Sequence, residues 1–128
     1  MLEIPADLLA AMRRLAQAAA PREACGLLLG EGERVLALAP SRNLAAAADA
    51  FEIDTALHLR LQRLARARPG RNVLGVWHSH PRGPAVPSAR DLAGAWDPGL
   101  AWLITAAEGT RGWRLRDQSF VEISLSTI

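Results

Sequence analysis

The 128-residue chain contains no lysine and no tyrosine, and it has a single cysteine, Cys25. One thiol cannot form an intramolecular disulfide or a cysteine-based zinc site, so a disulfide framework is excluded and a reducing compartment fits. All 15 side-chain cations are arginines, which raises the sequence pI to about 9.9 although the formal net charge is only +2. So small a net charge does not indicate a nucleic-acid binder.

Long apolar runs are also missing. No window approaches 18 uninterrupted apolar residues, so we expect no membrane-spanning helix. The three alanines at 18–20 resemble the end of a signal peptide, but Glu3 and Asp7 come before them and two arginines interrupt the apolar stretch. We therefore expect a cytoplasmic protein.

The composition, with 50% hydrophobic and 22% charged residues, predicts one globular domain over residues 1–128. Helical spacing of leucines predicts a helix between Pro5 and Pro21 and another that begins after Asp54 and ends before Pro69. A short third helix is expected after Ser88. Strands are predicted, in chain order, at 24–29, 34–38, 51–53, 73–78, 100–105, 112–117 and 120–125. This order indicates an α/β (α+β) fold, a mixed sheet flanked by helices.

His78 and His80 stand two residues apart at the end of a predicted strand, where residues i and i+2 point to the same face. Two such imidazoles can bind one zinc ion, and a catalytic zinc has a third protein ligand with water in the fourth position. Asp91 is the candidate third ligand, because it lies in the first turn of the helix after Ser88. The plainer interpretation is a capping box of Ser88 and Asp91. The two histidines and the prolines of the intervening loop are more than a cap requires.

A zinc-bound water would need a general base that takes its proton and returns it to the leaving amine. Glu23 is our candidate, because it precedes an apolar run expected in the middle of the sheet, where an acid is costly unless it is functional or exposed. Taken alone, Glu23 is more simply a solvated acid in the turn after Pro21.

Three other kinds of residue have plain interpretations. Cys25 could bring a thiol near the metal, but a small buried hydrophobic residue is the simpler interpretation. His58 has no motif partner and is treated as a surface or structural residue. The tryptophans could line a groove, although most are expected in the core; they are Trp77, Trp96, Trp102 and Trp113.

The segment His78-Ser79-His80-Pro81, with Ser88 and Asp91 after it and Glu23 before it, resembles the JAMM motif of the MPN-plus metalloproteases. The family pattern is a distant Glu, then His-x-His-Pro, with seven residues between the second His and a Ser and two more before an Asp. Every position is matched, and the apolar Cys25-Gly26-Leu27-Leu28-Leu29-Gly30 run follows the Glu. The predicted element order is also similar to the family's fold, which has a cytidine-deaminase-like architecture.

The resemblance implies that His78, His80 and Asp91 bind one zinc ion per chain, that Glu23 is the acid/base, and that Ser88 helps to stabilise an oxyanion. It further implies a short prokaryotic-type peptidase or isopeptidase. Its substrate would be the bond after the C-terminal glycines of a ubiquitin-like or sulfur-carrier protein, with neither nucleic acid nor membrane as a partner.

Two other classes of function can be compared with this one. A non-catalytic MPN-type scaffold remains the alternative, although scaffolds of that kind have lost ligands that this chain keeps. A zinc deaminase would need His-x-Glu and Pro-Cys-x-x-Cys segments, and the sequence has neither.

Overall fold

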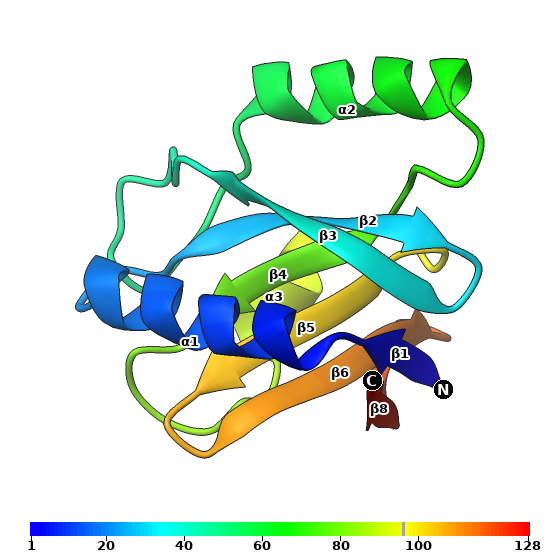
Figure 1. The fold of residues 1–128 in the computed structure, drawn as a ribbon. Helices are drawn as coiled ribbons and strands as arrows, with labels where there is room; N and C mark the ends of the chain where they lie inside the picture. Colours follow the sequence, from blue (N-terminus) through cyan, green and yellow to red (C-terminus); the bar gives the residue numbers. More distant parts are fainter. Residues whose placement is uncertain (96) are drawn as a thin grey trace.

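Short apolar runs separated by turn residues form one eight-stranded mixed sheet in the computed structural model, which describes residues 1–95 and 97–128 (Figure 1). In chain order the elements are β1 (Leu2–Ile4), α1 (Ala6–Ala19), β2 (Cys25–Glu31), β3 (Arg34–Ser41), α2 (Thr55–Ala67), β4 (Asn72–Ser79), α3 (Ala89–Gly94), β5 (Ala101–Ala106), β6 (Gly109–Arg116), β7 (Ser119–Ile123) and β8 (Leu125–Thr127). The mixed sheet with flanking helices confirms the predicted fold class.

The strand order across the sheet is β7-β6-β5-β4-β2-β3-β1-β8. Only Ser124 separates β7 from β8 in the chain, yet these strands stand at opposite ends of that order. The sheet therefore curls until its two ends come together. β4 lies at its centre, antiparallel to β2 and parallel to β5.

The two faces of the sheet have separate apolar cores. α1 covers one face and buries Met12 against Leu28 and Trp77. α2 and α3 belong to the other face, where Leu61 of α2 joins a core that contains Trp102 (Figure 1). Within the described residues, no helix is long and apolar enough to cross a membrane.

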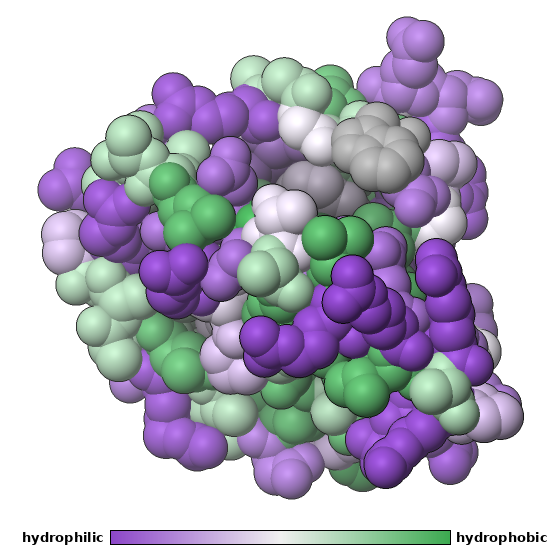
Figure 2. Space-filling model, turned by 90° about the horizontal axis from the view of Figure 1, so that it is seen from above, coloured by the Kyte–Doolittle hydropathy of each residue, from purple (hydrophilic) through white to green (hydrophobic). Residues whose placement is uncertain are grey.

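α2 forms an outer layer of the molecule and buries only Leu61. The side of the molecule that carries α2 is seen in Figure 2, where purple hydrophilic side chains alternate with green hydrophobic ones. Arg63 and Arg66 are exposed on the helix, and Leu59 and Leu64 are about half exposed. The outer face of this helix is therefore cationic, with exposed leucines beside the arginines.

The sequence analysis missed β1 and β8, which have three residues each and pair with one another in parallel. The strand predicted at 51–53 is wrong, because only an isolated bridge between Asn43 and Ile53 forms there. The strand predicted at 120–125 is divided at Ser124, where the chain passes from one end of the sheet to the other.

Gly75 lets β4 approach β5 closely. A Cβ atom at this position would lie 2.1 Å from the backbone oxygen of Ala101. No side chain can be accommodated unless the two central strands move apart. Because β4 carries His78, this contact also fixes the strand on which the candidate site is built.

We expect Gly75→Ala to lower the free energy of unfolding by about 3 kcal/mol, since the new methyl group must displace the backbone of β5. Urea denaturation measures the effect. Gly94→Ala is the matched control, because a Cβ there meets nothing within 4 Å, and it should not destabilise the protein. Equal unfolding free energies for the two variants would contradict the close contact.

Candidate metal centre

The end of β4 brings the two histidines together. His78 is the last but one residue of the strand and His80 follows it, with their Nε2 atoms 3.1 Å apart. The backbone holds both positions, because Ser79 N–H donates to Ala24 O and His80 N–H donates to Thr105 O. The strand end is thereby tied to both neighbouring strands.

Asp91 reaches the same point from α3. Its Oδ2 atom lies 3.2 Å from Nε2 of His78 and 3.2 Å from Nε2 of His80. The predicted capping box also forms: Ser88 Oγ accepts from Asp91 N–H, and Asp91 Oδ2 accepts from Ser88 N–H. Ser88 and Asp91 therefore cap the helix, and Asp91 at the same time belongs to the group of candidate metal ligands.

The three candidate ligand atoms lie nearly as far apart as the ligands of a tetrahedral zinc ion. They are His78 Nε2, His80 Nε2 and Asp91 Oδ2, and they are 3.1–3.2 Å from one another. Ligand atoms about 2.0–2.1 Å from a tetrahedral zinc ion are separated by about 3.3–3.4 Å. Two imidazole nitrogens and one carboxylate oxygen are also ligands that zinc accepts.

A metal ion binds its ligands in their deprotonated form, so the pKa values of these side chains matter. Burial lowers the pKa of His78, so its ring is neutral at physiological pH. Burial alone would raise the pKa of Asp91, but hydrogen bonds from His78 and His80 outweigh that effect and hold the pKa well below its usual range. Asp91 therefore offers an anionic oxygen and His78 a neutral nitrogen, while the hydrogen bond to Asp91 raises the pKa of His80.

Glu23 lies in the turn just before β2, not inside the strand. It is only 6% exposed, and one of its ligand atoms lies within 4.8 Å of those of His78, His80 and Asp91. Among the described residues, no side chain or backbone group hydrogen-bonds its Oε1 atom. Burial raises the pKa of Glu23 to about 7. Glu23 is therefore not a solvated acid, which was the simpler interpretation of this residue taken alone.

Aromatic rings orient His78. The ring of Phe51 stacks on its imidazole at 4.2 Å, with an angle of 16° between the planes. Trp102 meets it edge-on at 5.7 Å. His80 is oriented differently, with Nδ1 3.0 Å from Pro84 O in the proline-rich loop. Sequence reasoning missed this role of Phe51, because its brief alternation with Ile53 predicts a strand and gives no sign of a contact with His78.

A cleft of about 680 Å³ opens beside these groups. Glu23, His80 and Ser88 lie in its walls together with small side chains such as Ala48 and Ala89. The cleft gives the cluster access to solvent and to an extended ligand.

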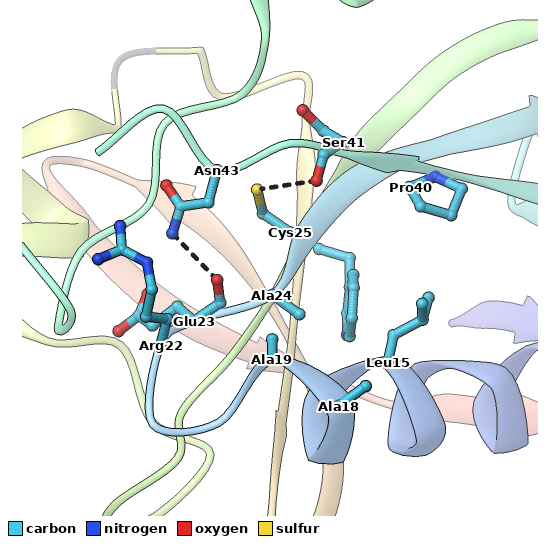
Figure 3. A pocket seen from close by; sticks show the side chains of 11 residues that line it. Leu15, Ala18, Ala19, Arg22, Glu23, Ala24, Cys25, Pro40, Ser41 and Asn43 are labelled. Atoms are coloured by element: carbon cyan, nitrogen blue, oxygen red, sulfur yellow. Dashed lines mark hydrogen bonds between the residues drawn. The ribbon is translucent and has the colours of Figure 1, made fainter. Parts of the chain in front are cut away.

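The remaining candidates are not among the side chains that could hold the metal. Cys25 is buried, its thiol faces the backbone oxygens of Ser41 and Arg42, and burial raises its pKa to about 11 (Figure 3). His58 is half-buried on α2, 3.3 Å from Gln62. Three tryptophans are buried as expected, namely Trp77, Trp102 and Trp113, whereas Trp96 lies outside the described residues.

A mixed sheet whose central strand ends in His-x-His, with an aspartate supplied by the following helix, defines the class of JAMM/MPN-type domains. Residues 5–116 match the family described as prokaryotic homologs of the JAB domain (Prok-JAB). The chain belongs to this family, which confirms the resemblance found in the sequence.

Two relatives have informative names. A "Probable TtuB-protein conjugate cleaving protease" of Thermus thermophilus is 36% identical over 121 residues, which are 90% of this chain and 76% of the relative. A "Desampylase" of Pyrococcus furiosus is 33% identical over 98 residues, or 76% of this chain and 69% of the relative. The solution structure of a protein from Desulfitobacterium hafniense has a TM-score of 0.87 and 30% identity, covering 100% of this chain and 93% of that one.

We expect His78→Ala and Asp91→Ala each to weaken zinc binding by more than about 100-fold, since changes behind the ligands alone can cost 10- to 100-fold. Zinc titration with a competing chelator measures the affinity. His58→Ala, which removes a histidine outside the cluster, is the control and should bind like the wild type. Full zinc affinity in both cluster variants would contradict the assignment.

Proposed function

We propose that the protein is a zinc-dependent peptidase or isopeptidase that hydrolyses the bond after the C-terminal glycines of a ubiquitin-like or sulfur-carrier protein. The observation that carries the proposal is the convergence of His78, His80 and Asp91 within 3.2 Å of one another, with a buried glutamate beside them. One zinc ion per chain, held by these three residues, would polarise the scissile carbonyl and acidify a bound water.

Glu23 is the proton carrier in this proposal. One oxygen of its buried carboxyl group lies within 4.8 Å of the ligand atoms, and its pKa of about 7 lets it both accept and release a proton near neutral pH. It would take a proton from water during attack and deliver it to the leaving amine. A glutamine has the same shape but cannot perform either transfer.

Ser88 is placed to stabilise the negative charge that develops on the carbonyl oxygen. Its Oγ atom accepts a hydrogen bond from Asp91 N–H, which leaves its own O–H free to donate. Ser88 also lines the cleft. A donor fixed by the helix cap needs no rearrangement during the reaction, which is what makes oxyanion stabilisation effective.

The substrate class follows from the cleft and from the relatives. Prolines and arginines line the cleft beside Ala48 and Ala89, and a glycine tail can pass these walls without placing a side chain against them. Two relatives bear names of enzymes that act on protein conjugates or remove a modifier. A glycine-ending tail that enters the cleft, with its folded body outside, satisfies both observations.

A non-catalytic scaffold would not require this arrangement. A buried carboxylate without hydrogen bonds costs several kcal/mol, and a scaffold gains nothing from it. Glu23 has such an oxygen beside three potential ligands. The presence of this buried glutamate beside the candidate ligands favours an enzyme over a scaffold.

We expect Glu23→Gln to retain zinc but to lose activity by about 10²- to 10⁴-fold, because the proton carrier is removed. Ser88→Ala should lose about 10²- to 10³-fold, which is the effect of removing one oxyanion donor. Turnover and zinc content are measured on the same samples. Glu31→Gln, an exposed glutamate at the far end of β2, is the matched control. Unchanged turnover in Glu23→Gln would assign the base to another residue.

The substrate prediction uses a carrier that ends in Gly-Gly and is fused to a short C-terminal extension. We expect release of the extension, no release after chelation, and recovery when zinc is restored. A second fusion, with the last glycine replaced by Phe, should be cut at least about tenfold more slowly, because a bulky side chain clashes with the cleft walls. Equal rates for the two fusions would indicate a general peptidase.

A further inference from the structure

Residues 44–52, which we call the wall loop, form one side of the cleft. Ala48 and Asp49 line the cleft itself, and Phe51 stacks on His78. Most of the loop is alanine, so few of its own side chains can hydrogen-bond to fix its path. The two ends of the loop meet at the isolated bridge between Asn43 and Ile53 and at the hydrogen bond from Leu44 N–H to Glu52 O. Its shape must therefore be imposed by residues outside it.

Asn43 supplies four of the fixing hydrogen bonds. Its Oδ1 atom accepts from the N–H groups of Ala45 and Glu52, at 2.9 and 3.0 Å. Its Nδ2 atom donates to Ala50 O at 2.9 Å and to Glu23 O at 3.0 Å (Figure 3). An asparagine amide has two donor hydrogens and one oxygen with two lone pairs, so every hydrogen-bonding position of this side chain is used.

The fourth bond joins the wall loop to Glu23. Glu23 precedes the first ladder position of β2, so the regular sheet does not fix it. Its segment is held from two sides: Asn43 binds its carbonyl oxygen, and Ser79 Oγ accepts from Ala24 N–H at 2.8 Å. Ser79 belongs to the same strand end as His78, so the Asn43 amide completes the connection between wall loop, glutamate and ligand strand.

We propose that Asn43 is a positioning residue, which sets the place of Glu23 relative to the metal ligands by binding its main chain and the wall loop as one unit. The inference rests on the proposed function for the role of Glu23. Asn43 contacts neither the ligand side chains nor the interior of the cleft, so its removal should leave metal binding intact. It acts on the proton carrier through the Glu23 main chain, and its bonds to the wall loop support the same connection.

Asn43→Asp is the sharpest test. The carboxylate keeps the size and the acceptor oxygen, but it replaces two N–H donations with repulsion toward the carbonyl oxygens of Glu23 and Ala50. We expect kcat to fall by about 10²-fold, the scale for a catalytic group misplaced by about 1 Å, with a smaller effect on KM and with zinc affinity unchanged. Arg42→Ala is the matched control, because this neighbouring side chain is exposed and, among the residues that the structure describes, pairs with Asp54 alone. It should retain wild-type kcat.

A double-mutant cycle separates positioning from general damage. In a Glu23→Gln background, measured under single-turnover conditions, Asn43→Asp should cost less than about threefold, because the group that it positions is already inactive. A merely structural role would lower the rate by the same factor in both backgrounds. Equal factors would therefore overturn the inference.

Hydrogen exchange gives a readout that does not depend on activity. The Ala24 amide, bonded to Ser79, should exchange at least about tenfold faster in Asn43→Asp and in Asn43→Ala, while the Trp77 amide within β4 keeps its protection. The inference would be overturned if the Ala24 amide kept its protection, if kcat stayed at the wild-type value, or if the variants lost zinc. It would also be overturned if both Asn43 variants were unfolded at 25 °C. If the wild-type protein cuts no fusion, the proposed function fails, and the exchange result still decides whether Asn43 holds the Glu23 segment.

Discussion

The structure depends on one electrostatic constraint at the end of β4. Two carboxyl groups and two imidazoles are brought together there, and three of these side chains are buried: Glu23 and Asp91 at 6% exposure and His78 completely. Such a cluster is costly in a protein interior unless a cation or a proton neutralises it. The surrounding elements hold it in place nevertheless: β2 and β5 tie the strand end from both sides, and α3 presents the aspartate. A divalent cation bound at the cluster would compensate for much of this cost.

The helix cap shows how one local structure serves two purposes. Ser88 and Asp91 form a reciprocal capping box, which fixes both side chains at the start of α3. The same Asp91 Oδ2 atom that accepts from Ser88 N–H also lies 3.2 Å from both histidine nitrogens. The capping interpretation and the ligand interpretation of the sequence were therefore not exclusive. The cap supplies the rigidity that a metal ligand needs in order to keep its geometry.

Most of the candidate site could be predicted from the sequence because its members are close together in the chain and have a fixed spacing. His78, His80, Ser88 and Asp91 span one strand end, one loop and one helix start, all recognisable locally. β1 and β8 could not be predicted, since three-residue strands show no periodicity and are defined only by pairing between the two ends of the chain. Asn43 was missed for a related reason: its four partners lie up to 20 residues away, and no pattern in an alanine-rich segment marks them.

The wall loop is held unequally along its length. Arg22, next to Glu23, donates to the carbonyl oxygens of Ala45 and Ala46, and Asn43 secures the two ends of the loop. At the cleft, Asp49 forms an ion pair with Arg90, and both side chains are exposed. An exposed pair of this kind contributes at most about 1 kcal/mol, whereas the hydrogen bonds from Asn43 and from the charged Arg22 side chain contribute more together. The loop can therefore adjust where a substrate tail would pass, while the part bonded to Glu23 stays fixed.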